Sequence, residues 1–271
     1  MNDNCQVAAV TRSATRADEF RQAGLHPLLL DLAAPGNDCE IPAADVVLWA
    51  VGFDRTAGVP REKVWIDGLQ WLVRSLPEPP RRFIYISSTS VYGASKGETV
   101  NESTPPNPST DGGQFCVQAE QLLRAECRQR FPDTQVIVLR MAGIYGPNRL
   151  LRRVADLRQQ TPLPGAPDHW LNLIHVEDAV RAVQYAAVSE SVPGIINVMN
   201  TRSVTRGQYY ARLAELTSVP APVFGSDTSS GRQRGGHKRV VSIYANPHAD
   251  FEFNDVLQGL DDAWQKTPSP K

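Results

Sequence analysis

The feature that most constrains this chain is an alternation of short apolar runs with amphipathic stretches, which continues from the first residues to about Val198. Short apolar runs are typical of buried strands, and the stretches between them carry apolar residues at helical spacing. Strands that alternate with helices in this way are typical of a parallel sheet with helices on both faces. The pattern therefore predicts an α/β protein with a doubly wound parallel sheet.

The boundaries of the predicted elements follow from the same pattern. The strands are Gln6–Thr11, Pro27–Leu32, Val46–Val51, Phe83–Ser87, Val136–Arg140 and Ile195–Val198. The helices are about Ala14–Ala23, Arg61–Leu76, Gly113–Arg130, Leu150–Gln160 and Val176–Val188. Ser13 or Thr15 can cap the first helix by accepting from its unpaired amides, and Gly24 can end that helix in a left-handed conformation.

The alternation breaks down after Asn200, which predicts a second, smaller lobe. A helix at about Thr205–Thr217, a strand at Arg239–Tyr244 and a final helix remain. Ser218–Gly236 is rich in Pro, Gly and Ser, so it is either a mobile loop or lid or an ordinary connector. The expected core comprises residues 1–146 and 172–200, and the expected lobe comprises residues 147–171 and 201–271.

Composition narrows the class of protein and of partner. The 271 residues are 41% hydrophobic and 21% charged, as in globular proteins. The net charge is −1 and the arginines are scattered, which argues against nucleic-acid binding. No apolar run approaches the roughly 18 residues of a membrane span, and no signal peptide is evident, so we expect a cytoplasmic protein. Cys5, Cys39, Cys116 and Cys127 lack metal-binding spacing, so we expect free thiols and no metal site.

Hydroxyl side chains crowd the end of one predicted strand. Phe83–Ser87 runs into Ser-Ser-Thr-Ser-Val-Tyr-Gly at residues 87–93, and ligands of open α/β sheets bind at the carboxyl ends of strands. This string resembles the active-site strand of the extended short-chain dehydrogenases/reductases, the nucleotide-sugar epimerase and dehydratase superfamily. A Ser/Thr-rich turn whose hydroxyls cap the next segment is the alternative interpretation of the string.

Further blocks resemble the same family in the same order. Leu139–Pro147 is similar to its strand and loop beside the nicotinamide, and Gly194–Val198 to its last core strand. Leu171–Ala179 is similar to its N-x-I-H-V-x-D-x-A helix entry, where we expect His175 to cap or pack the helix start and Asp178 to favour the positive end of the helix. The resemblance implies a Rossmann-like core with a small C-terminal substrate lobe.

The beginning of the chain departs from the family pattern. Family members open with a strand, a G-x-x-G-x-x-G loop and a helix whose amides hold the cofactor pyrophosphate. This sequence lacks that motif, and Gln6–Ser13 resembles the second strand and its turn. The missing strand would be central, and losing about five buried apolar side chains at roughly 2 kcal/mol each removes of the order of 10 kcal/mol. We therefore expect cofactor binding to be weak or absent in this form, and an N-terminally incomplete gene product is one interpretation of the missing segment.

The resemblance also assigns a cofactor site. A residue at the end of the second strand faces the adenine ribose, and Arg12 there could bind a 2′-phosphate, which implies NADP over NAD. An ordinary exposed arginine is the alternative. The implied cofactor-binding residues are Thr11, Arg12, Ser13, Asp31, Leu32, Ala50, Val51, Gly52, Ser87, Met141 and Gly143.

The catalytic pair of the family is altered. Its reaction uses a tyrosine acid/base and a lysine four residues later, which lowers the tyrosine pKa. Ala119–Leu123 resembles the family's A-E-x-L-L, which places Gly112 at the tyrosine position and Cys116 at the lysine position. Neither residue can perform that role.

Other polar residues remain as candidates for the reaction. Ser88 falls at the serine position that orients the substrate oxygen, and Tyr92, usually structural in this string, could form a relocated pair with Lys96. Candidate substrate-binding residues are Ser90, Asn172, Arg149 and Arg239.

The resemblance implies an NAD(P)-dependent epimerase/dehydratase-like oxidoreductase acting on a sugar nucleotide or another small carbonyl or hydroxyl substrate. A non-catalytic NADP-binding sensor or interaction protein is the alternative that Gly112 and Cys116 favour, and an incomplete gene product is the one that the missing glycine loop favours. A homodimer is compatible with the resemblance, because relatives often dimerise through two helices.

Overall fold

A computed structural model describes residues 5–36, 40–94, 96–147, 149, 151–225, 237–244, 253 and 255–267. The chain divides into two compact units. Unit 1 comprises Met1–Phe83 and Gln118–Val136, and unit 2 comprises Ile84–Val117 and Ile137–Lys271.

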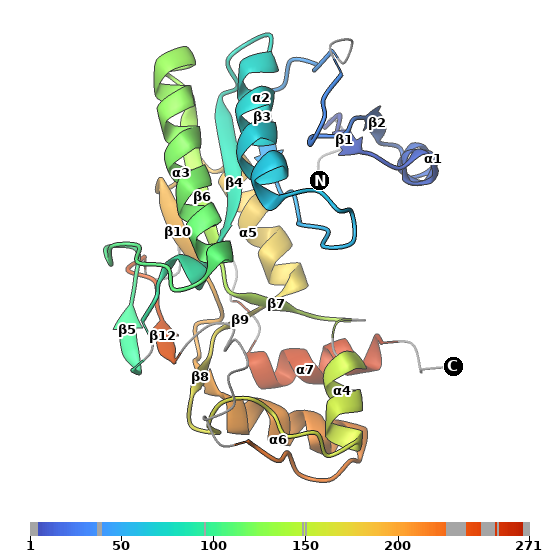
Figure 1. Ribbon diagram of the computed structural model, residues 1–271, viewed down its shortest axis with the longest axis vertical. Helices are drawn as coiled ribbons and strands as arrows, with labels where there is room; N and C mark the ends of the chain where they lie inside the picture. The colour runs from blue at the N-terminus through green and yellow to red at the C-terminus, as the bar shows by residue number, and fades with distance from the viewer. Residues whose placement is uncertain are drawn as a thin grey trace. The chain divides into compact units, whose positions relative to one another are not determined.

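A four-stranded sheet runs in the order β10-β6-β4-β3 (Figure 1). Its strands are β3 (Val46–Trp49), β4 (Arg82–Ser88), β6 (Gln135–Met141) and β10 (Ile195–Val198). Strands β6 and β10 are parallel, with Val138 opposite Ile195 and Met141 opposite Val198. The middle of β4 and of β6 is buried, as expected for strands covered on both faces. The prediction of an α/β protein with a parallel sheet is confirmed.

Unit 1 begins with a separate parallel pair, β1 (Ala8–Thr11) and β2 (His26–Leu29), joined by α1 (Ala14–Gln22). The predicted caps of α1 are confirmed. The Ser13 side chain accepts a hydrogen bond from the amide of Arg16 at 3.3 Å, and Gly24 follows the helix with a φ of +76°.

The helix predicted at 61–76 is more complex than expected. A π-helical turn at Lys63–Asp67 precedes α2 (Gly68–Ser75). At the junction, a Cβ on Gly68 would lie 2.7 Å from the carbonyl oxygen of Leu32. The absent side chain therefore lets the helix approach the segment after β2. Because π-helical turns add one residue to a helical pattern, apolar periodicity alone does not distinguish them from an α-helix.

The helix α3 (Asp111–Arg130) runs through both units. In unit 1, its Glu126 accepts from Arg74 at 2.7 Å and from Gln70 at 2.6 Å. The Arg74 hydrogen bond is the largest cause that holds the pKa of Glu126 below its ordinary value, and the Gln70 bond acts in the same direction, while burial opposes the shift.

Unit 2 continues with short strands between helices, most of them too short to give a sequence pattern. The further elements are β5 (Glu98–Val100), β7 (Gly143–Tyr145), α4 (Leu151–Arg158), β8 (Trp170–Leu171), β9 (Leu173–His175), α5 (Val176–Val188), β11 (Val204–Thr205), α6 (Arg206–Thr217), β12 (Lys238–Val240) and α7 (Val256–Gln265). The strand predicted at Arg239–Tyr244 is thus the shorter β12. Of the predicted loop Ser218–Gly236, residues 226–236 lie outside the described part.

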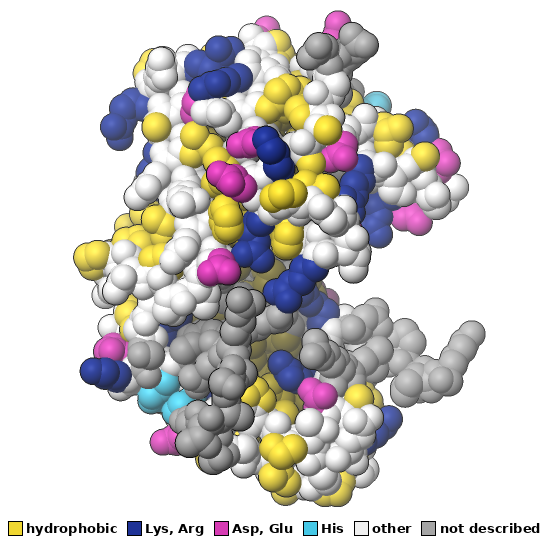
Figure 2. Space-filling model, viewed as in Figure 1, with side chains coloured by type: hydrophobic (Ala, Val, Ile, Leu, Met, Phe, Trp, Pro, Cys, Tyr) yellow, Lys and Arg dark blue, Asp and Glu magenta, His cyan; other side chains and the backbone are white. Residues whose placement is uncertain are grey.

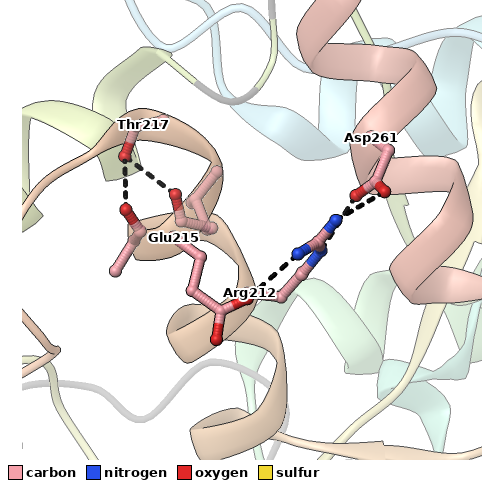
Figure 3. Close-up of polar contacts among 6 residues, drawn as sticks. Arg212, Glu215, Thr217 and Asp261 are labelled. Carbon is pink, nitrogen blue, oxygen red and sulfur yellow. Dashed lines mark hydrogen bonds and ion pairs between the residues drawn. The ribbon is translucent and has the colours of Figure 1, made fainter.

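Helices α6 and α7 pack around a buried cluster that includes Tyr145, Leu213 and Leu260. Arg212 on α6 makes a two-point contact with Asp261 on α7, at 2.7 and 3.0 Å, and also contacts Glu215 (Figure 3). Planar two-point pairing of this kind fixes orientation as well as distance.

Within the described residues, no helix is both long enough and apolar enough to cross a membrane. On the face drawn in Figure 2, Lys and Arg side chains are interspersed with Asp and Glu side chains.

Candidate functional site

The carboxyl end of β4 leads into a short 3₁₀ turn, Thr89–Val91. The Ser88 hydroxyl accepts a hydrogen bond from the amide of Ser90 at 3.1 Å, so it caps this turn as the alternative interpretation of the string anticipated. A hydroxyl that accepts one bond can still donate its own proton. Ser88 and Ser90 are both half-buried.

The first turn of α3 lies directly against this segment. A Cβ on Gly113 would stand 2.4 Å from the carbonyl oxygen of Ser90 and 2.8 Å from Cβ of Pro108. Gly112 is half-buried and Cys116 is buried, one helical turn further along. The start of α3 therefore packs against the turn that follows β4, and the residues at the expected tyrosine and lysine positions are a glycine and a cysteine.

Tyr92 is held in a buried network. Its hydroxyl donates to Oδ1 of Asn197 and accepts from Nη1 of Arg140, both at 2.9 Å. Burial raises the pKa of Tyr92, and the nearby Arg140 charge opposes this shift. Both hydrogen-bonding functions of the phenol are thus engaged inside the protein. A catalytic role for Tyr92 stays a prediction.

The same network extends to Glu102, which the sequence analysis missed. Its carboxylate accepts from the Asn197 amide at 2.8 Å, the Ser242 hydroxyl at 2.6 Å and the Ile243 amide at 2.9 Å. A single acidic residue in a loop gives no pattern by which to detect this role. Glu102 ties β10 to the segment that follows β12.

The predicted substrate-binding residue Asn172 clamps β12. Its side-chain amide donates to the carbonyl of Lys238 and accepts from the amide of Val240, both at 2.9 Å. Arg239, the residue between Lys238 and Val240, contacts other groups. Its guanidinium lies 5.4 Å from the Trp170 ring centroid, and its Nε donates to the Ser203 hydroxyl at 3.0 Å. Lys238 itself is buried, and burial lowers the pKa of its ammonium to about 8.

Of the remaining predicted residues of unit 2, Ser87 is buried on β4, Met141 ends β6 and Gly143 begins β7. Met141 is buried and Gly143 is exposed, with its amide donating to the carbonyl of Asn172 at 3.0 Å. Arg149 is exposed. His175 caps α5 as predicted, because its Nδ1 accepts from the Glu177 amide at 3.3 Å.

In unit 1, the predicted cofactor residues follow the parallel strands β1 and β2. The strand ends meet at one edge, since Thr11 lies opposite Leu29 and its carbonyl accepts from the Leu30 amide at 2.9 Å. Arg12 forms an ion pair with Asp54, a residue that the sequence analysis did not select. Asp31 binds the amide of Ala33 at 2.9 Å in a tight turn.

The predicted cofactor-binding residues Ala50, Val51 and Gly52 follow directly after β3. An added Cβ on Gly52 would meet nothing within 4 Å, so space is open beside it. Asp54 further along is fixed by Thr56, whose hydroxyl and amide both donate to Oδ1 at 2.6 and 2.8 Å. These hydrogen bonds, with the Arg12 contact, hold the pKa of Asp54 below its ordinary value.

Among the described residues, no group of His, Cys, Asp and Glu side chains could hold a metal ion. Of the described cysteines, Cys5, Cys116 and Cys127 take part in no disulfide, and Cys39 lies outside the described part.

Comparison with known proteins decides the family. The sequence model described as "NAD dependent epimerase/dehydratase family" matches residues 2–198. The chain belongs to this family. Protein YeeZ of Escherichia coli K12 is 31% identical over 234 residues, which span 82% of this chain and 80% of that protein.

Solved structures support the fold of this family member. A functionally unknown conserved protein from Silicibacter pomeroyi has a TM-score of 0.71 and 23% identity, covering 97% of this chain and 91% of that one. UDP-glucuronic acid 4-epimerase from Bacillus cereus, solved in complex with NAD, has a TM-score of 0.74 and 17% identity, covering 98% and 91% of the two chains.

The donor set in unit 1 of this epimerase/dehydratase family member fits the adenosine end of a nicotinamide dinucleotide. The guanidinium of Arg12 suits a phosphate, and the carboxylate of Asp31 suits ribose hydroxyls. The backbone at Gly52 leaves room for a ligand to approach closely. The sequence contains no G-x-x-G-x-x-G motif for the pyrophosphate. The fit therefore concerns the adenosine end.

Proposed function

We propose that this chain is an atypical NAD(P)-dependent oxidoreductase of the epimerase/dehydratase type, acting on a sugar nucleotide or another small carbonyl or hydroxyl substrate. The observation that supports the proposal is the packing of Gly113, at the start of α3, against the carbonyl of Ser90 in the turn that Ser88 caps. The sugar-nucleotide class is supported by solved neighbours whose titles name UDP-glucose or UDP-glucuronic acid with NAD.

Each proposed residue has a distinct task. The Ser88 hydroxyl donates a hydrogen bond to the substrate oxygen, and Ser90 lines the same turn. Bound cofactor supplies the hydride acceptor or donor at the substrate carbon. Met141 and Gly143 would border the nicotinamide, and Arg12 would favour NADP by pairing with a 2′-phosphate. Arg149 or Arg239 would meet a phosphate or carboxylate of the substrate.

Proton transfer follows a route other than the usual tyrosine and lysine, because Gly112 has no side chain and the Cys116 thiol does not supply the positive charge of the lysine. The same two residues favour the second candidate, a non-catalytic NADP-binding sensor. The two candidates differ in whether substrate changes the redox state of the bound cofactor. We further propose that the protein works in the cytoplasm on a small molecule, and that a homodimer is its assembly.

The test uses the purified chain with NADPH, NADH, NADP⁺ and NAD⁺. Calorimetry and thermal shift measure binding, since a ligand at 100 times its Kd adds about 2.7 kcal/mol of stability. Chromatographic or NMR analysis of the sugar products then reports turnover with UDP-sugars, because an epimerase or dehydratase returns the hydride and regenerates its cofactor, whereas absorbance of reduced nicotinamide reports only a net oxidation or reduction. Turnover that falls in Ser88→Ala but not in Lys96→Met supports the enzyme, binding without turnover supports the sensor, and no binding at all contradicts both.

A further inference from the structure

An ion pair occupies the residue on which cofactor preference is proposed to depend. Arg12 follows β1, and its Nη2 contacts Oδ2 of Asp54, which lies beyond β3 in the same unit. The side chains are 50% and 45% exposed, so a ligand in solution can reach both. An approaching anion thus meets a guanidinium that already has a carboxylate partner.

Asp54 is fixed in place from its other side. Its Oδ1 accepts from the Thr56 hydroxyl at 2.6 Å and from the Thr56 amide at 2.8 Å. The two oxygens are therefore divided, with one facing Thr56 and the other facing Arg12. Because the Thr56 bonds fix the carboxylate, its position does not depend on Arg12, and the carboxylate remains if a ligand draws Arg12 away.

A fixed carboxylate at this distance acts on a ligand in two ways. It competes with an incoming phosphate for the guanidinium, and it repels any negative charge that comes to lie beside Arg12. A ligand with free ribose hydroxyls suffers neither effect, since a hydroxyl can donate to a carboxylate. The pair thus opposes the preference that Arg12 alone would confer.

We propose that Asp54 is a specificity-determining residue, an internal counter-ion that occupies Arg12 and weakens discrimination in favour of a 2′-phosphate. The inference rests on the proposed function, because it assumes that Arg12 faces the adenine ribose. Exposed ion pairs are weak, so the expected effect is about fivefold in affinity.

The experiment uses probes that need no pyrophosphate site. Adenosine 2′,5′-bisphosphate and AMP differ by the 2′-phosphate, and their Kd values are measured by NMR titration against wild-type protein, Asp54→Asn and Arg12→Gln. Asp18→Asn is the matched control, since Asp18 is an exposed carboxylate paired with Arg21 at 2.6 Å in the same unit. Thermal unfolding checks that each variant is folded.

Asp54→Asn is expected to bind the bisphosphate about fivefold more tightly with AMP affinity unchanged, and Asp18→Asn to change neither. An equal gain for both probes, or no gain for the bisphosphate including undetectable binding, overturns the role of Asp54. Thr56→Val, which releases one bond on the carboxylate, is expected to give a smaller gain in the same direction. The proposed Arg12 preference is tested separately: it fails if Arg12→Gln weakens neither probe or both equally.

Discussion

Gly113 lies against the carbonyl of Ser90, so closely that an added Cβ would stand 2.4 Å from that oxygen. Gly113→Ala should therefore push α3 away from the end of β4, at a cost of about 1 to 3 kcal/mol in unfolding free energy. Denaturant unfolding measures the loss. Gly36→Ala is the control, because a Cβ at Gly36 meets nothing within 4 Å, and an equal loss in both variants would contradict this account.

Tyr92→Phe removes the phenol that joins Arg140 to Asn197. Both partners are buried, so each loses a hydrogen bond without access to water, and we expect a loss of about 1 to 3 kcal/mol. Tyr185→Phe removes a hydroxyl from an exposed contact with the Ser191 carbonyl at 3.3 Å and should cost much less. If Tyr92→Phe abolishes turnover while leaving the unfolding free energy unchanged, its role is catalytic and the structural account is wrong.

The free energy of unfolding should depend on pH because Lys238 is buried. It is 3% exposed, and burial lowers its pKa to about 8 from 10.5. The folded state therefore binds fewer protons than the unfolded state between these values, and stability should rise as the pH increases from 8 to 10.5. Lys238→Met should flatten this slope in unfolding experiments. Lys96→Met, at an exposed position, should retain it, and an unchanged slope in Lys238→Met would refute the assignment.

Arg12→Asp tests cofactor preference in the intact dinucleotides. The substitution places a second carboxylate beside Asp54, so NADPH should lose far more affinity than NADH, because only NADPH carries the 2′-phosphate. Calorimetry gives both Kd values. Equal weakening would mean that Arg12 acts on the fold or on both nucleotides alike.

The sequence predicts the elements that have a long periodic pattern. The core strands and the helices α3 and α5 lie within a few residues of their expected bounds. Burial on both faces determines the composition of the strands, and burial of one stripe determines that of the helices. The caps at Ser13, Gly24 and His175 were also predictable, because each depends on a local side chain or φ angle.

Contacts between distant segments could not be predicted in this way. The clamp of Asn172 on β12 joins residues 66 and 68 positions apart, and the Glu102 contacts with Ser242 and Ile243 span 140 and 141 positions. Their residue types are common in loops, so neither local propensity nor periodicity indicates them. The ion pair of Arg12 with Asp54 is of the same kind, 42 positions apart.

Strands β1 and β3 belong to one unit but to different sheets, and in the described residues each has an edge with no strand beside it. Val10, Leu29 and Leu48 on these strands and on β2 are 41%, 60% and 46% exposed. Unpaired edges that carry apolar side chains are where chains add to one another and aggregate. Concentrated samples of this protein should therefore self-associate through unit 1, and a charge at Leu48 on the edge strand β3 should reduce that association.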